Sequence, residues 1–152
     1  MTGTTSARIV SGMAEQEPQL RRVIYTSVSE LPASRYAEEE EIARMLATSR
    51  RNNARHGLTG ALLYGNRRFA QVLEGPPDGV AALLDALAGD PRHSALTVLD
   101  SDAIGQRCFG AWTMAYLSDM DLIPPEMAAL NESLGLLLRL RAVIGEVAPL
   151  PA

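Results

Sequence analysis

"LTGALLYGNRRFAQVLEG", residues 58–75, holds two apolar stretches joined by a polar turn, which is the pattern of a β-hairpin. Side chains alternate along a strand, so Phe69, Gln71 and Leu73 share one face of the second stretch. The amide of Gln71 therefore lies between two large apolar groups. Burying an amide without partners costs about 1–3 kcal/mol, so this strand predicts either an exposed amide or buried groups that need its donors and acceptor.

The sequence on either side of this hairpin predicts a five-stranded sheet. Further strands are expected over residues 21–27, 95–100 and 111–117, which are β-branched, aromatic or alternating in hydrophobicity. Apolar residues at helical spacing predict one helix over about residues 35–55 and a second that ends at Gly89. The order βαββαββ favours an α+β fold: a ferredoxin-like, mixed and mostly antiparallel sheet with one extra strand and both helices on one face.

The C-terminal extension, residues 119–152, is expected to cover the opposite face of the sheet. It contains Pro124 and Pro125 and then apolar residues at helical steps, which predicts a short helix followed by a longer one over about residues 131–146. Additional leucines widen the apolar stripe of the longer helix, so we expect a homo-oligomer that uses this surface. The first residues, 1–20, are polar and without period, as in a flexible arm.

Length, charge and cysteine content narrow the class of protein. A chain of 152 residues is long enough for one core, and 14 basic against 18 acidic residues, a net charge of −4, argue against a nucleic-acid partner. The single cysteine, Cys108, cannot form an internal disulfide, which favours a reducing compartment. No apolar run approaches the roughly 20 residues of a membrane span, and the start of the chain lacks the apolar core of a signal peptide. We therefore expect a cytoplasmic protein without a membrane partner.

Signals for catalysis are few. The sequence has no glycine-rich phosphate loop, no G-x-S-x-G turn and no metal-ligand spacing. His56 is expected to be solvated at a helix C-terminus, and His93, which follows a loop arginine, is expected to be exposed. We therefore predict that the protein is not an enzyme and holds no metal.

Four polar side chains are nevertheless expected to point inward from separate elements. Tyr25 lies on the first strand and Gln71 on the hairpin. Ser49 and Asn53 lie on the inward stripe of the first helix. If these side chains converge, they frame an apolar pocket with a few hydrogen-bonding groups, the usual composition of a small-molecule or cofactor site. A satisfied internal hydrogen-bond network would give the same pattern, so the residues alone leave both interpretations open.

Five stretches of the chain form a specific pattern through their order and spacing. They are "VIYTS", "ATSRRNNARHGLTGALLY", "FAQVLEGP", "DPRHSALTVL" and "RCFGAWTMAY". Together they resemble the BLUF domain, a blue-light sensor that uses FAD. The resemblance covers roughly residues 20 to 117 and predicts a flavin-binding domain over residues 21–118, followed by the helical extension.

The resemblance implies FAD held noncovalently between the two helices, with its ring edge facing the sheet. Tyr25 resembles the electron donor to the photoexcited flavin, and Gln71 resembles the amide that bridges this tyrosine and the ring. Asn53 would bond the pyrimidine-like end of the ring, with Ser49 and Asn52 nearby. The other residues that the resemblance implies are the apolar walls Ile42, Met45, Phe69 and Leu73, the phosphate-side residues Arg92 and His93, and the photoactive pair Trp112 and Met114.

Trp112 and Met114 are expected on the last strand. Alternation along residues 111–117 places both side chains on one face of that strand. In the family that the chain resembles, the position of this pair near the flavin differs between states. Without the resemblance, Trp112 would be interpreted as a partly buried anchor of the sheet.

The leading hypothesis is a stand-alone photoreceptor. Light-altered contacts near the last strand would bias the docking of the C-terminal helices, and a downstream protein partner or self-assembly would supply the output. FMN is also a candidate cofactor, because its ring is identical to that of FAD. Two other classes stay open: a small ferredoxin-like hydrolase that uses Asn53 with a nearby arginine, and a ligand-free interaction module that works through its leucine-rich tail.

Overall fold

The computed structural model describes residues 19–118, 121–127 and 131–145. Within them, five strands and three helices follow one another in the order predicted from the sequence. The strands are β2 (Leu20–Ser29), β3 (Thr59–Gly65), β4 (Arg68–Gly75), β5 (His93–Ile104) and β6 (Ala115–Ser118), and the helices are α2 (Arg35–His56), α3 (Pro77–Ala88) and α4 (Asn131–Gly145).

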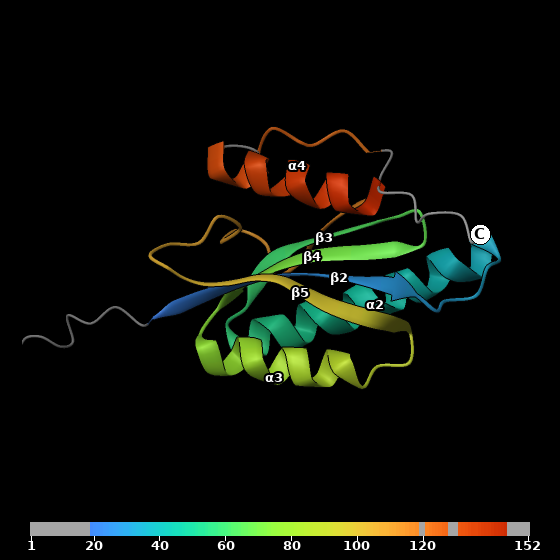
Figure 1. The fold of residues 1–152 in the computed structure, drawn as a ribbon, viewed down its shortest axis with the longest axis horizontal. Helices are drawn as coiled ribbons and strands as arrows, with labels where there is room; N and C mark the ends of the chain where they lie inside the picture. The colour runs from blue at the N-terminus through green and yellow to red at the C-terminus, as the bar shows by residue number, and fades with distance from the viewer. Residues whose placement is uncertain (1–18, 119–120, 128–130, 146–152) are drawn as a thin grey trace, which may run out of the picture.

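The strands form one sheet in the order β5-β2-β4-β3-β6 (Figure 1). Every neighbouring pair is antiparallel except β3 and β6, which run parallel. The predicted hairpin is confirmed, since β3 pairs with β4, and Asn66 and Arg67 turn the chain with φ angles of 55° and 59°. Two successive residues with positive φ are typical of a type I′ turn, whose twist matches that of the flanking strands. The α+β, ferredoxin-like plan with one extra strand is therefore confirmed.

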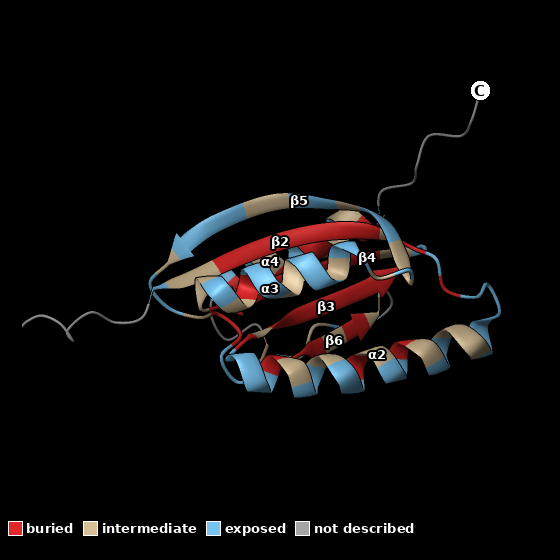
Figure 2. Cartoon of the chain, turned by 90° about the horizontal axis from the view of Figure 1, so that it is seen from below, coloured by how far each residue is buried: buried red, intermediate tan, exposed pale blue. Residues whose placement is uncertain are grey.

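The sheet separates two layers of helices. α2 and α3 cover one face, and α4 covers the other (Figure 1). The central strands β2, β3 and β4 are buried along most of their length, whereas the edge strand β5 is largely exposed (Figure 2). Because successive side chains of a strand point to opposite faces, each central strand contributes residues to both layers.

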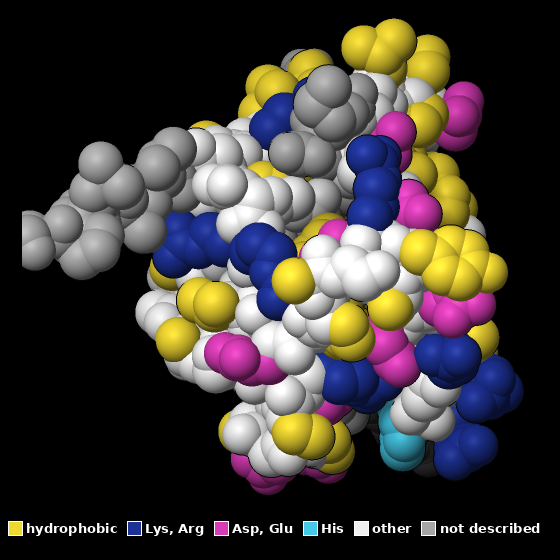
Figure 3. Space-filling model, turned by 90° about the vertical axis from the view of Figure 1, so that its right-hand side faces the viewer, with side chains coloured by type: hydrophobic (Ala, Val, Ile, Leu, Met, Phe, Trp, Pro, Cys, Tyr) yellow, Lys and Arg dark blue, Asp and Glu magenta, His cyan; other side chains and the backbone are white. Residues whose placement is uncertain are grey.

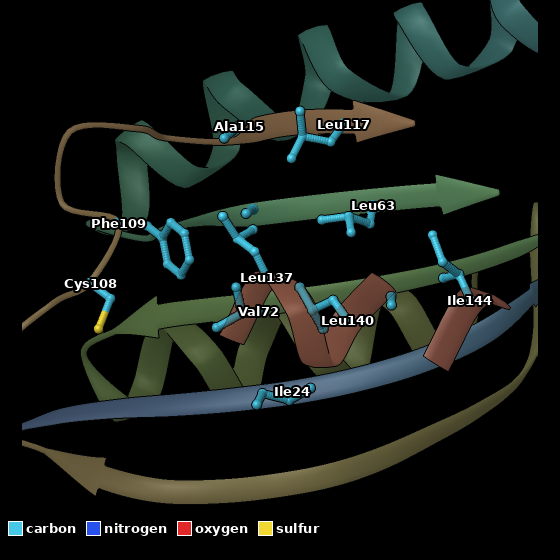
Figure 4. Packing of buried hydrophobic residues seen from close by; sticks show 12 residues of the cluster. Ile24, Leu63, Val72, Cys108, Phe109, Ala115, Leu117, Leu137, Leu140 and Ile144 are labelled. Carbon is cyan, nitrogen blue, oxygen red and sulfur yellow. The ribbon is translucent and has the colours of Figure 1, made fainter. Parts of the chain in front are cut away.

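The layer between the sheet and α4 has a large apolar cluster at its centre. Phe109, Leu137, Leu140 and Ile144 are all 0% exposed, and Figure 4 shows the three α4 side chains directed at the strands. Burying one large aliphatic side chain stabilises the fold by about 1.5–3 kcal/mol, so this layer contributes much of the stability. The prediction that a C-terminal helix covers this face is confirmed. The strand residues that complete the cluster are Ile24, Ala61, Leu63, Ala70, Val72, Ala115 and Leu117.

The ends of the chain are described only in part. The segment before α4 forms a turn in which the Met127 N–H donates to the Pro124 carbonyl at 3.0 Å, and the rest of the predicted short helix, residues 128–130, lies outside the described residues. Residues 146–152 and residues 1–18 of the predicted arm also lie outside them. The division of the chain at residues 20 and 118 therefore stays a prediction. None of the helices in the described ranges has the length and apolar character needed to cross a bilayer.

The last strand is shorter than predicted, and this corrects the placement of Trp112. β6 begins at Ala115 rather than at residue 111, because the carbonyls of Thr113 and Met114 accept hydrogen bonds from side chains of α2 instead of joining the strand ladder. Trp112 packs against the apolar cluster on the α4 side, while Met114 lies in the cluster on the α2 side. The two side chains therefore do not share a face.

Candidate functional site

Tyr25 and Gln71 face each other across neighbouring strands. They are directly paired in the register of β2 with β4, lie in the layer under α2 and α3, and are 3% and 5% exposed. The Tyr25 hydroxyl donates to Gln71 Oε1, and Gln71 Nε2 donates to Met114 Sδ at 3.2 Å. The buried amide therefore has a partner at each end, one of them a thioether, which is a weak acceptor.

Two cavities, together called the groove, lie beside this pair between α2, α3 and the sheet. The groove consists of one cavity of about 30 Å³ next to Gln71 and a second of about 170 Å³ nearer the C-terminal end of α2. Ser49 and Asn53, four residues apart on α2, line the first and the second cavity respectively, so both cavities lie along the same helix face. The first is lined by Tyr25, Met45, Ser49, Leu62, Phe69, Gln71, Leu87, Asp90 and His93, and the second by Asn52, Asn53, His56, Leu58, Ala82, Leu83 and Ala86.

Asn53 carries a buried acceptor that its surroundings do not use. Its side chain is fully buried, Nδ2 donates to the Thr113 carbonyl at 2.6 Å, and Oδ1 has no hydrogen-bond partner among the described residues. Gly57, with φ of 71°, ends α2 in the left-handed conformation and donates its N–H to the Asn53 carbonyl, which fixes this last turn. An unpaired buried acceptor costs about 1–3 kcal/mol, so the site suits a ligand that brings an N–H or O–H donor to Oδ1.

His93 is not the exposed loop residue that the sequence predicted. It begins β5, because this strand pairs with β2 as far as Ser29, and it is half-buried beside the first cavity. Its Nε2 lies 2.6 Å from the Leu87 carbonyl, which can only accept, so Nε2 carries a proton. Nδ1 lies 2.8 Å from Ser27 Oγ. Both ring nitrogens are therefore held in place. His56, as predicted, is exposed at the end of α2.

Asp90 places a negative charge at the rim of the first cavity. The Arg92 guanidinium donates to both carboxylate oxygens, with a shortest contact of 2.6 Å, and these hydrogen bonds hold the pKa of Asp90 below its ordinary value. Burial raises the pKa of Tyr25 far above its ordinary value, and the charge of Asp90 adds to this effect. The Tyr25 phenol therefore stays protonated at neutral pH and acts as a donor toward Gln71.

The structure brings together most, but not all, of the residues proposed for the site. Ile42 and Leu73 are buried in the same apolar cluster but do not line either cavity. Arg92 is engaged by Asp90, and Trp112 lies on the other side of the sheet. Among the cavity residues, the sequence prediction includes Tyr25, Met45, Ser49, Phe69, Gln71 and His93 for the first cavity and Asn52 and Asn53 for the second.

Three residues of the first cavity were not predicted. Leu62 is the hairpin partner of Gln71, so strand register could have identified it. Leu87 lies on the apolar stripe of α3, so the helical spacing of apolar residues could have identified it as facing the sheet. Asp90 lies in the turn after α3, and its approach to the cavity depends on its pairing with Arg92, which no local pattern indicates.

The amino-acid sequence that builds this site matches a known family. A family model described as "BLUF: Sensors of blue-light using FAD" matches residues 20–115. The chain belongs to the BLUF family. The resemblance drawn from the sequence motifs is therefore confirmed, and with it the class of blue-light flavin sensors. BLUF domains are sensory modules rather than catalytic ones, and the matched region makes up most of this chain.

Curated BLUF relatives are much longer proteins. The photoactivated adenylate cyclase subunit beta of Euglena gracilis is 30% identical over 122 residues, which cover 78% of this chain and 14% of that protein. The subunit alpha of the same enzyme is 36% identical over 98 residues, which cover 64% of this chain and 9% of that protein. The chain thus spans a small fraction of the length of these relatives, and the match does not extend over most of either cyclase subunit.

Solved BLUF structures share the fold. The dark-state structure of BlrB, a BLUF protein, superposes with a TM-score of 0.65 at 28% identity and covers 83% of this chain and 97% of that one. A structure of Klebsiella pneumoniae BlrP1 with FMN and cyclic diGMP gives a TM-score of 0.64 at 26% identity, covering 84% of this chain and 35% of that one. These matches agree with the five-stranded sheet and its helices.

Proposed function

We propose that this BLUF protein is a blue-light photoreceptor that binds FAD in the groove between α2 and α3 and signals by rearranging the hydrogen bonds of Gln71. The observation that carries the proposal is the buried chain from Tyr25 through Gln71 to Met114, together with Asn53 Oδ1, which has no hydrogen-bond partner in the described part of the chain. The flavin, when bound, supplies absorption of blue light and an excited state that accepts an electron. Tyr25 would be the electron donor to the bound flavin, and its hydroxyl donates to Gln71 Oε1.

The chemistry of Gln71 suits a reversible switch. Its planar end carries an acceptor oxygen and a two-donor nitrogen, so turning or tautomerising the amide exchanges donor for acceptor toward its neighbours. The contact to Met114 Sδ is a weak one, and little is lost when it is exchanged. Since a hydrogen bond nets about 0.5–1.5 kcal/mol, the two arrangements lie close in free energy, and a light-formed arrangement reverses thermally.

The residues around Gln71 are assigned roles in holding the cofactor. Asn53 would accept a hydrogen bond from the pyrimidine-like end of the ring, with Ser49 and Asn52 beside it on α2. Arg92 and His93 would approach the phosphate side of the cofactor. Apolar contacts would come from Met45 and Phe69, which line the first cavity, and Ile42 and Leu73 belong to the same buried cluster. FAD is proposed over FMN because the family is described by its use of FAD.

Output is proposed to pass through contacts with another protein chain. α4 packs on the sheet face opposite the flavin groove and exposes Leu134 and Leu138, so a change in its docking alters a surface available to a second copy or a downstream partner. On the face shown in Figure 3, arginine and acidic side chains are interspersed, unlike the single-sign surfaces that bind nucleic acids. We further propose a cytoplasmic protein with no nucleic-acid or membrane partner and no enzymatic activity of its own.

The test is the replacement Gln71→Leu. The purified parent protein should be yellow, with a flavin spectrum that shifts to the red under blue light and recovers in the dark. The variant should retain flavin and lose the reversible shift, because leucine can neither donate nor accept a hydrogen bond. Gln106→Leu, at an exposed loop position, is the matched control and should keep the shift. A colourless parent protein, or an unchanged photocycle in the Gln71 variant, would contradict the proposal.

A further inference from the structure

Glu74 is a buried carboxylate at the end of β4, three residues after Gln71. Its side chain points to the α4 side of the sheet and is 0% exposed. It accepts the backbone N–H of Cys108 at 2.7 Å and that of Phe109 at 2.9 Å, and it lies 3.3 Å from the guanidinium of Arg22. A buried charge is tolerated only when it is paired and hydrogen-bonded, and these partners meet that requirement. Glu74 therefore fixes the position of the chain at residues 108 and 109.

The segment that Glu74 holds, residues 107–114, runs from one face of the sheet to the other. At its start, Phe109 lies in the apolar cluster under α4, and Figure 4 shows the loop from there to Ala115 on β6. At its end, the carbonyl of Met114 accepts from Arg50 Nε at 3.0 Å, and Met114 Sδ accepts from Gln71. One short segment thus contacts both the proposed light-sensitive amide and the α4 layer.

Arg22 connects the same carboxylate to α4. Its guanidinium contacts Glu74 through Nε and Nη2 and donates from Nη1 to Glu132, in the first turn of α4, at 2.8 Å. This hydrogen bond holds the pKa of Glu132 below its ordinary value, so the pair is ionised at neutral pH. Nη2 also lies 3.0 Å from Cys108 Sγ, whose thiol stays protonated because burial raises its pKa to about 11. The start of α4 is therefore tied to the residue that holds the crossing segment.

We propose that Glu74 and Arg22 are positioning residues that couple the Gln71 site to the docking of α4. When the amide of Gln71 exchanges its partners, Met114 and the segment 107–114 shift against Glu74, and Arg22 passes the change to Glu132. The two-state element is the network Glu74–Arg22–Glu132, whose ion pair to α4 is retained in one state and loosened in the other. This inference rests on the proposed function, because it requires light to act on Gln71.

The test measures hydrogen–deuterium exchange of the α4 amides, in the dark and under blue light, in the flavin-loaded full chain. In the parent protein, light should change the exchange of residues 132–145. In Glu132→Gln, which alters a half-exposed side chain and leaves the flavin groove intact, the red shift should remain. Exchange of α4 in the dark should rise by about two- to five-fold, and the light–dark difference should fall to roughly half or less, because loss of a partly exposed ion pair is worth up to about 1 kcal/mol.

A second pair of variants keeps the test decisive. Glu74→Gln should abolish the light–dark difference in the exchange of α4. If Glu74→Gln does not fold, Glu132→Gln alone tests the coupling. Arg139→Gln is the matched control, since it removes another ion pair of α4, with Asp100 on β5, and should loosen α4 without removing its response to light. A parent protein with no red shift would count against the proposed function. A normal red shift with an unchanged α4 response in Glu132→Gln, or an equal loss in Arg139→Gln, would overturn the coupling alone.

Discussion

The two faces of the sheet are built from the same strands but with different chemistry. On the α4 side, Phe109, Leu140 and Ile144 are fully buried in an apolar cluster, and the buried polar side chains Arg22 and Glu74 on this side are paired with each other. On the α2 and α3 side, Tyr25 and Gln71 stand among apolar neighbours next to two cavities. Alternation along each strand allows the two faces to differ, so that the polar groups of one face lie beside free space.

The difference separates the residues that hold the fold together from those that the proposed ligand requires. A tightly packed apolar layer stabilises the fold whether or not a ligand is bound. The opposite layer contains a buried acceptor, Asn53 Oδ1, that finds no partner within the described ranges, and a weak contact between Gln71 and Met114. Both features are unfavourable or nearly neutral for stability. A protein stabilised mainly by one layer can keep such groups in the other, where a ligand makes use of them.

The largest effect on stability is expected in the α4 layer. Leu140→Ala leaves a cavity beneath α4 and should lower the free energy of unfolding by about 2–5 kcal/mol. Leu138→Ala, on the same helix but 51% exposed, should change it by less than about 0.5 kcal/mol. Denaturant unfolding of both variants measures the difference. Equal losses would mean that the layer is not packed as the structure describes.

The next effect concerns the protonation of Tyr25 and appears at high pH. The pKa of this phenol is raised by burial in the folded protein, whereas in the unfolded chain it is about 10. Above that pH the unfolded chain releases the proton while the folded protein retains it, so the free energy of unfolding should fall by up to about 1.4 kcal/mol per pH unit. Below a pH of about 10, the folded and the unfolded state both bind the proton, so Tyr25 makes a constant contribution to the free energy of unfolding.

Tyr25→Phe checks this interpretation because it keeps the ring and removes the titrating group. The variant should lose stability less steeply than the parent protein between about pH 9 and about pH 11, as measured by denaturant unfolding at a series of pH values. Parallel curves for the two proteins would show that Tyr25 is not the group responsible.

Much of the fold could be predicted because its signals are local. The alternation around Gln71 correctly placed that side chain with Phe69 and Leu73, and helical spacing indicated the α4 layer. Pairing of Tyr25 with Gln71 then follows from the register of β2 with β4, once both strands are assigned to the same sheet. Local patterns therefore predicted most of the residues that line the first cavity, but only Asn52 and Asn53 of those that line the second.

The position of Trp112 could not be obtained in this way. Strand alternation assigned it to the face of Met114, but the chain at residues 107–114 follows contacts with residues distant in the sequence. The carboxylate of Glu74 and the amide of Asn53 fix this segment, and a glutamate in a motif gives no indication of which backbone N–H groups it will accept. Similarly, His93 was assigned to a loop because the extension of β5 depends on its pairing with Ser29.

The smallest effect, and the one that separates the two faces most sharply, concerns Asn53. Asn53→Ala removes both the hydrogen bond to the Thr113 carbonyl and the unpaired Oδ1, so these changes partly offset each other in the protein without flavin. FAD affinity should fall about five-fold, or about 1 kcal/mol, as measured by titration of FAD into protein from which flavin has been removed. Ser133→Ala, a buried polar deletion on the α4 side, is the control and should leave the affinity unchanged. If both variants weakened binding equally, the assignment of ligand contacts to one face would be wrong, because the loss would then follow general loosening of the fold.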